Sequence, residues 1–286
     1  MRKKSGIFCF LPLFLSLPLL LAPLQARAQS ADEIVRKVVG NELWADGHDH
    51  SRWMYRDAYK SPDKDIVKMA IETPQGNLSM VIEDHGQPPS SQEHQADLAR
   101  IQRMVTDPTF RAQQKKNEQH DGQQARDMLQ MLPDAFVWTI VNRSGDDVTL
   151  SFHPNPNFSP GSMNAKVLAA MSGTMVVDET VMRLKALRGH LDQPVEFAWG
   201  LLGHLDAGGV FRIERADIGD GSWQITGMHV HISGRALFFK TIGDQEDEVT
   251  SDYHPVPADV SIQKAAEMLR DGEVARILGI DTHPGA

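Results

Sequence analysis

Apolar and polar residues alternate along most of residues 173–253, with almost no helical period. In residues 195–201 the odd-numbered positions are apolar, and in residues 211–214 Phe and Ile alternate with Arg and Glu. A period of two places apolar side chains on one face of a strand and polar ones on the other. The segments are short and are bounded by Gly, Pro or Asp. They therefore predict consecutive antiparallel strands, as in a sandwich or barrel.

One change of parity inside this stretch predicts a bulge. Apolar residues occupy odd-numbered positions in residues 223–225 and even-numbered positions in residues 228–232, and Gly227 lies at the change. A β-bulge at that point would keep these apolar side chains on one face of the sheet. Bends of this kind curve a sheet around a cavity.

Earlier segments of the chain also have the composition of strands. Residues 50–60, 64–73 and 76–84 predict a three-stranded meander, and residues 135–142 and 146–153 predict a hairpin. Together with the later stretch they give about ten or eleven strands. The fold class that we expect is mainly β (α+β), in one domain.

Helical periodicity is found in two regions before the alternating stretch and in one region after it. A capping box that begins at Ser30 precedes a predicted helix over residues 31–43. Residues 88–132 predict an insert of two helices, the second beginning at Pro108. The insert is interpreted as a surface cover for the sheet, with a mobile lid as the alternative.

The end of the chain differs from the alternating stretch before it. The segment from 244 to 256 is acidic, and we expect it to form an exposed edge that leads into the C-terminal tail. Residues 258–280 predict one or two short helices.

The N-terminus has the three parts of a secretory signal peptide. A basic start, MRKK, is followed by an apolar stretch and by Ala26-Arg27-Ala28, an A-x-A cleavage site. We expect cleavage after Ala28, export of the mature protein, and a single domain over residues 29–286; an uncleaved anchor is the alternative. Cys9, the only cysteine, lies in the segment that would be removed, so the mature chain should contain no disulfide.

The charge balance argues against two classes of partner. Removal of residues 1–28 takes away four of the 29 basic residues and none of the 38 acidic ones, so the mature net charge would be −13. Nucleic acids and anionic lipid surfaces attract proteins of the opposite sign, so neither is an expected partner. No later apolar run reaches the roughly 18 residues that a membrane-spanning helix needs.

The order of these elements resembles that of the periplasmic outer-membrane lipoprotein-sorting, or lipoprotein-carrier, superfamily. The motifs that carry the resemblance are SGTMVVDETVMRLKAL at 172–187, a Gly-Gly-x-Phe-x-Ile-Glu segment at 208–214, Trp223, and SGRALFF at 233–239. The resemblance implies a half-open antiparallel barrel whose concave face is covered by helices. It also implies a periplasmic location and a cavity for acyl chains. We expect no enzymatic activity and no cofactor. The first strand, SRWMYRDAY, departs from the family pattern, and Arg52 and Arg56 are the candidates for the family's internal arginine.

The hypothesis for function is therefore the binding of an apolar ligand in a curved-sheet cavity. The expected cargo is a lipid or an acylated protein carried across the periplasm, with a possible membrane partner in the envelope; oligomeric state is not predicted. Large apolar residues on the strands are the candidates for lining the cavity, although such residues also make ordinary cores. They are Met69, Met80, Trp138, Phe197, Trp199, Leu201, Phe211 and Trp223.

Histidine provides the competing hypothesis. His229 and His231 alternate on one strand, so their imidazoles share a face and form half of a zinc site, which His48, His50 or a carboxylate would complete. A metal-dependent hydrolase is therefore the alternative, and solvated surface histidines are the simpler interpretation.

The chain has no G-x-S-x-G motif and no Gly-rich phosphate loop. A third hypothesis is a structural or partner-binding envelope protein whose cavity is filled by its own helices.

Overall fold

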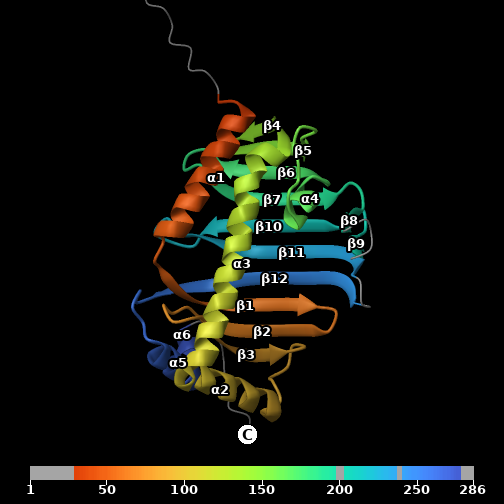
Figure 1. Ribbon diagram of the computed structural model, residues 1–286. Helices are drawn as coiled ribbons and strands as arrows, with labels where there is room; N and C mark the ends of the chain where they lie inside the picture. Colours follow the sequence, from red (N-terminus) through yellow and green to blue (C-terminus); the bar gives the residue numbers. More distant parts are fainter. Residues whose placement is uncertain (1–28, 198–202, 237–239, 278–286) are drawn as a thin grey trace, which may run out of the picture.

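The computed structural model describes residues 29–197, 203–236 and 240–277 (Figure 1). These residues form an open, antiparallel sheet of 12 strands together with helices, which confirms the predicted α+β half-barrel class. The strands are β1 Arg52–Ser61, β2 Lys64–Ile71, β3 Leu78–Asp84, β4 Phe136–Ser144, β5 Asp147–Pro154, β6 Met171–Asp178, β7 Arg183–Leu191, β8 Val195–Phe197, β9 Gly203–Leu205, β10 Val210–Asp217, β11 Trp223–Ala236 and β12 Lys240–Val256. The helices are α1 Ala31–His48, α2 Ser91–Thr106, α3 Pro108–Ala135, α4 Met163–Leu168, α5 Ile262–Arg270 and α6 Glu273–Ile277.

The strand order places the first strand, β1, beside the last strand, β12, in the interior of the sheet. The order is β3-β2-β1-β12-β11-β10-β7-β6-β5-β4, and the short strands β8 and β9 extend the sheet beside β11. The expectation that residues 244–256 form an acidic edge is wrong, because β12 is a central strand paired with β11 on one side and β1 on the other. Its charged residues are tolerated there because the middle of the sheet is only half-buried on both faces.

The register defines two faces of the sheet. Residues directly opposite one another in an antiparallel pair have their side chains on the same face. The face toward α1 and α3, called here the front face, carries one continuous row from β5 to β1: Leu150, Met175, Leu187, Ile213, Met228, Glu248 and Tyr59. The opposite face, called the back face, carries Arg188, Arg212, His229, Asp247 and Lys60.

The predicted bulge is present and has the expected effect. Glu214 lies opposite Gly227, whereas Arg215 lies opposite Ile225, so Thr226 is the extra residue of β11. Because of this insertion, Ile225 and Met228 both lie on the front face despite their opposite parity.

The larger core, called the first core, lies on the front face of β4–β7. Residues of α1, α3 and α4 pack there against Leu150 and Met175, both of which are fully buried. Gly189 of β7 leaves room for the ring of Phe211, because a Cβ atom at Gly189 would overlap that ring. The absence of a side chain on β7 thus lets β10 place an aromatic ring across it.

The second core lies on the back face of β1–β3. Met69, Ile71 and Met80 pack there against α2 and α5. Helix α2 also covers the free edge of β3, where Asp97 accepts a hydrogen bond from the backbone N–H of Val81 at 2.7 Å. This contact satisfies an edge donor that could otherwise pair with another chain.

A buried carboxylate fastens α1 to the sheet. Helix α1 begins with the predicted capping box and extends to His48, five residues beyond the predicted end. Glu42 is only 3% exposed; it accepts hydrogen bonds from Arg183 at 2.9 and 3.1 Å and from the Leu184 N–H at 2.9 Å, and it pairs with Arg215. Burial by itself would raise the pKa of Glu42, but these donors and charges outweigh burial and hold the pKa below its usual range.

Helices α2 and α3 occupy the predicted insert. Asp107 caps α3 and Pro108 begins it, as expected. Figure 1 shows α3 running across the front of the sheet, from α2 to the β4 end. Phe110 at its start packs on the second core and Leu132 near its end on the first, whereas residues 115–121 are all exposed. Within the described residues, no helix combines the length and apolar character required to cross a membrane.

Candidate functional site

The apolar row of the front face continues beyond the first core. On β10 and β11 the row is only half-buried, although its members on β5 and β6 are fully buried. We call these half-buried residues the front strip: Phe211, Ile213, Met228, Val230 and Ile232. The strip lies on the front face, which α3 crosses (Figure 1). It is therefore apolar surface on the helix-covered face that the described helices do not fully bury.

A pocket of about 240 Å³ adjoins the strip, between β1, β11 and β12. We call it the acidic pocket. Its lining residues are Tyr55, Glu72, Gln224, Ile225, Gly227, Met228, Glu248, Thr250 and Tyr253. The rings of Tyr55 and Tyr253 stack with centroids 5.1 Å apart, and Trp53 meets Tyr253 edge-on at 6.2 Å. The pocket thus combines aromatic walls with two carboxyl groups.

The carboxyl groups of the pocket are held in an environment that disfavours their charge. Burial raises the pKa of Glu72, and a hydrogen bond from the Trp53 N–H at 3.1 Å only partly offsets that effect. Burial and the nearby carboxylate of Asp57 raise the pKa of Glu248. Burial also raises the pKa of the Tyr55 hydroxyl, which therefore stays protonated and can donate a hydrogen bond. A cationic or hydrogen-bond-donating ligand group would relieve this electrostatic cost.

Beside the pocket, Asp57 is almost completely buried yet incompletely paired. Lys68 lies 3.0 Å from its Oδ2 atom, whereas Oδ1 has no hydrogen-bond partner among the described residues. Asp57 is 7% exposed. Its charge adds to that of Glu72 and Glu248, so the polar end of the front face is locally negative.

The strip and the pocket are contiguous. Met228 lines the pocket and also belongs to the strip, and it lies directly opposite Glu248 in the β11–β12 register. One ligand can therefore contact both regions, with an apolar part along β10 and β11 and a polar part between β12 and β1. An amphipathic molecule has this distribution of chemistry.

The structure does not bring the five predicted lining residues whose side chains it describes, Met69, Met80, Trp138, Phe211 and Trp223, into one cavity. Met69 and Met80 lie in the second core, on the back face. Trp138 is buried in the first core and donates its indole N–H to the Leu132 carbonyl at 3.2 Å. These three residues have the exposure of ordinary core residues.

Of the other predicted lining residues, only Phe211 and Trp223 have described side chains, and neither belongs to the interior of a core. Phe211 belongs to the front strip and packs against the first core. Trp223 is half-buried at the start of β11, with the guanidinium of Arg183 5.6 Å from its ring. Trp199, Leu201 and the side chain of Phe197 lie outside the described residues.

The sequence-based interpretation missed the acids and tyrosines of the pocket. Glu248 and Tyr253 belong to β12, which was not predicted to be a central strand, and Tyr55 and Glu72 come from β1 and the residue after β2. Their proximity depends on the pairing of β12 with β1, which joins segments about 190 residues apart. The segment 244–250 reads DQEDEVT, so no alternation of apolar and polar residues marked this part of β12 as a strand.

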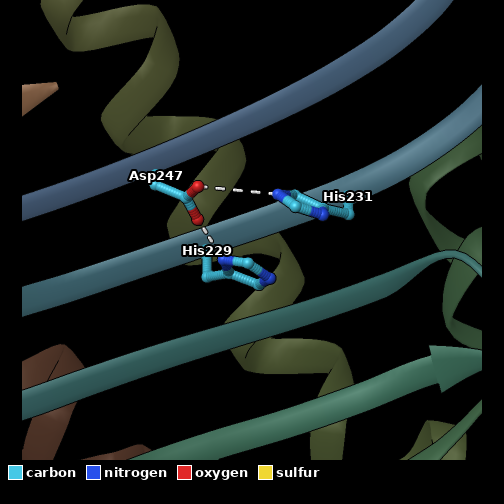
Figure 2. Close-up of side chains that lie close together, drawn as sticks. All are labelled: His229, His231 and Asp247. Carbon is cyan, nitrogen blue, oxygen red and sulfur yellow. Dashed lines mark hydrogen bonds and ion pairs between the residues drawn. The ribbon is translucent and has the colours of Figure 1, made fainter. Parts of the chain in front are cut away.

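A separate polar cluster lies on the back face (Figure 2). His229 and His231 of β11 share this face, as predicted, and Asp247 of β12 lies directly opposite His229. Nδ1 of His229 contacts Oδ1 of Asp247, and Nε2 of His231 is 3.6 Å from Oδ2. His48, a predicted third ligand, instead stacks on Trp44 at the end of α1.

Comparisons with known proteins supply no family for this chain. No protein-family model matches it, and no curated protein matches it either.

Proposed function

We propose that the protein binds an amphipathic ligand, a lipid or an acylated protein, with its apolar chain along the front strip. The observation that carries this proposal is the strip itself, which continues the row of the first core but is only half-buried. The resemblance to lipoprotein carriers, whose cargo is of this class, supports the same conclusion. Under this proposal the protein is a non-enzymatic carrier that acts in the periplasm after its signal peptide has been cleaved behind Ala28.

The energetics of the strip favour chains over small molecules. Each methylene group removed from water contributes about 0.8 kcal/mol, so a long chain accumulates affinity along β10 and β11. Met228 can adapt to irregular chains because methionine is flexible and polarizable. Helix α3 runs across the same face of the sheet and would lie over the bound chain (Figure 1).

Replacing Met228 with Asp tests the proposal. A carboxylate in the middle of the strip must be desolvated by a bound chain, so we expect a fluorescent acyl-chain probe to bind at least about tenfold more weakly. The measurement is a fluorescence titration at neutral pH. The matched control is Val249→Asp, because Val249 is 55% exposed and lies on the back face of β12. Equal affinity in wild type and Met228→Asp would remove the strip from consideration.

The acidic pocket specifies the polar end of the ligand. We infer that this end carries hydrogen-bond donors or a positive charge, because Glu72 and Glu248 flank the pocket and Asp57 lies beside it. The stacked tyrosines add aromatic faces of the kind that attract organic cations. An anionic head group would meet like charges.

Binding of a cationic amphiphile should therefore strengthen as the pH rises. Glu72 and Glu248 have raised pKa values, so they lose their protons above the ordinary value of 4.5, and only the ionised forms attract a cation. Titrations with an alkyltrimethylammonium and an alkyl sulfate of equal chain length check this prediction. Glu248→Gln should reduce the pH dependence for the cation. A preference for the sulfate across the whole pH range would contradict the proposed polar end while leaving the apolar strip intact.

A further inference from the structure

We propose that His229, His231 and Asp247 form a site for one divalent transition-metal ion on the back face of the sheet. One possible ligand atom from each residue lies within 4.8 Å of the other two. A tetrahedral ion with ligands about 2.1 Å away separates its ligand atoms by roughly 3.4 Å, so modest side-chain rotations close the site. Two imidazoles and one carboxylate are a ligand set that suits Zn²⁺, Cu²⁺ or Ni²⁺.

Rigid backbone pairing holds the three side chains together. The two histidines are two residues apart on β11, and their ring centroids are 4.0 Å apart. β12 lies beside β11 over ten paired positions, which fixes Asp247 opposite His229. Figure 2 shows the carboxylate facing both imidazoles, one oxygen toward each. The ligands therefore come from two hydrogen-bonded strands rather than from a loop.

The back face itself provides the comparison that separates a metal site from ordinary ion pairs. His190 lies 3.0 Å from Asp192, and His204 lies 3.2 Å from Asp206. Each of these pairs has one imidazole for one carboxylate. The group around Asp247 is the only cluster of three possible ligands found within the described ranges of the chain.

The positive charges next to the cluster are occupied by other partners. Arg212 lies opposite His229 on β10, but its Nε is 3.0 Å from Glu214. Lys60 lies opposite Asp247 on β1, but its Nζ is 2.8 Å from Asp65. Neither cation forms an ion pair with Asp247, although the charge of Lys60 is close enough to interact with it.

The partial exposure of the three ligands leaves one coordination position of the ion open to solvent. The side chains of His229, His231 and Asp247 are each about 40% exposed. With three protein ligands, a tetrahedral ion keeps one position open for water or for a donor from another molecule. Mg²⁺ and Ca²⁺ prefer sites made of oxygen ligands alone, so the two nitrogen ligands disfavour them. The site lies on the opposite face from the front strip and does not depend on the proposed ligand there.

Calorimetric titration of Zn²⁺ tests this inference, with protein that carries no polyhistidine tag and has been freed of metal by a chelator. We expect one ion per chain. His229→Ala, His231→Ala and Asp247→Asn should each weaken binding by about tenfold or more, the loss that follows even when a group supporting a metal ligand is removed. His190→Ala and His204→Ala are the matched controls and should leave the affinity unchanged.

Asp247→Asn guards the test against loss of folding, because it keeps the shape of a half-exposed side chain. A Co²⁺ titration adds a spectroscopic readout, since nitrogen and oxygen ligands produce a visible absorption that should disappear in the three site variants. Absence of saturable binding would overturn the inference. So would equal loss of binding in the His190→Ala control, or unchanged binding in all three site variants.

Discussion

Replacing Glu42 with Ala is expected to lower the free energy of unfolding by about 3–5 kcal/mol, the cost of removing one partner from a buried ion pair. The loss is large because Arg183 and Arg215 would remain buried without their counter-charge; their side chains are 13% and 18% exposed. The N–H of Leu184 would also lose its acceptor. Denaturant unfolding monitored by circular dichroism measures the change.

A second ion pair on the same helix provides the control. Arg36 of α1 meets Asp134 of α3 at 2.7 Å, but both side chains are more than half exposed, so Arg36→Ala should cost less than about 1 kcal/mol. Similar losses for Arg36→Ala and Glu42→Ala would contradict the role assigned to the buried carboxylate.

Glu42 should also account for part of the loss of folding stability at acidic pH. The pKa of Glu42 is lowered in the folded protein from an ordinary value of 4.5. Its contribution to stability is therefore complete above pH 4.5 and disappears as the pH falls through the lowered pKa. In Glu42→Gln, the free energy of unfolding should decline less between neutral pH and that acidic range than in wild type.

The second large effect concerns the two cores. Leu150→Ala in the first core and Ile71→Ala in the second should each lower the free energy of unfolding by about 2–5 kcal/mol, because both side chains are fully buried. The two residues lie in different clusters and on opposite faces, so their effects should add to within about 0.5 kcal/mol.

Additivity is measured from the two single variants and the double variant by denaturant titration. A deviation of more than about 1 kcal/mol would show that the two residues share packing partners, against their assignment to two separate cores. Separate unfolding transitions would instead contradict a single cooperative sheet.

Much of this architecture could be predicted from local patterns. Alternation predicted the strands, the capping box predicted the beginning of α1, and Asp107-Pro108 predicted the beginning of α3. Even the bulge opposite Glu214 followed from a change of parity beside Gly227. These features depend on the backbone and side-chain preferences of a few neighbouring residues, so a single sequence contains them.

Features that depend on strand order were not predictable in this way. Periodicity shows which residues of a strand share a face, but not which face a distant strand presents. Met69 and Trp138 were therefore expected to line one cavity, whereas the register places them on opposite faces. The pairing of β12 with both β11 and β1 also decides which acids reach each site: Glu248 on the front and Asp247 on the back.

Native mass spectrometry tests the central claim, the binding of an amphipathic ligand on the front strip, most directly. The protein should be purified gently from the cells that produce it, and any bound molecule extracted into organic solvent for identification. We predict a stoichiometric adduct with the mass of a lipid or acyl chain in wild type and in Val249→Asp, and its loss in Met228→Asp. A protein that carries no adduct and takes up no added amphiphile would contradict the account.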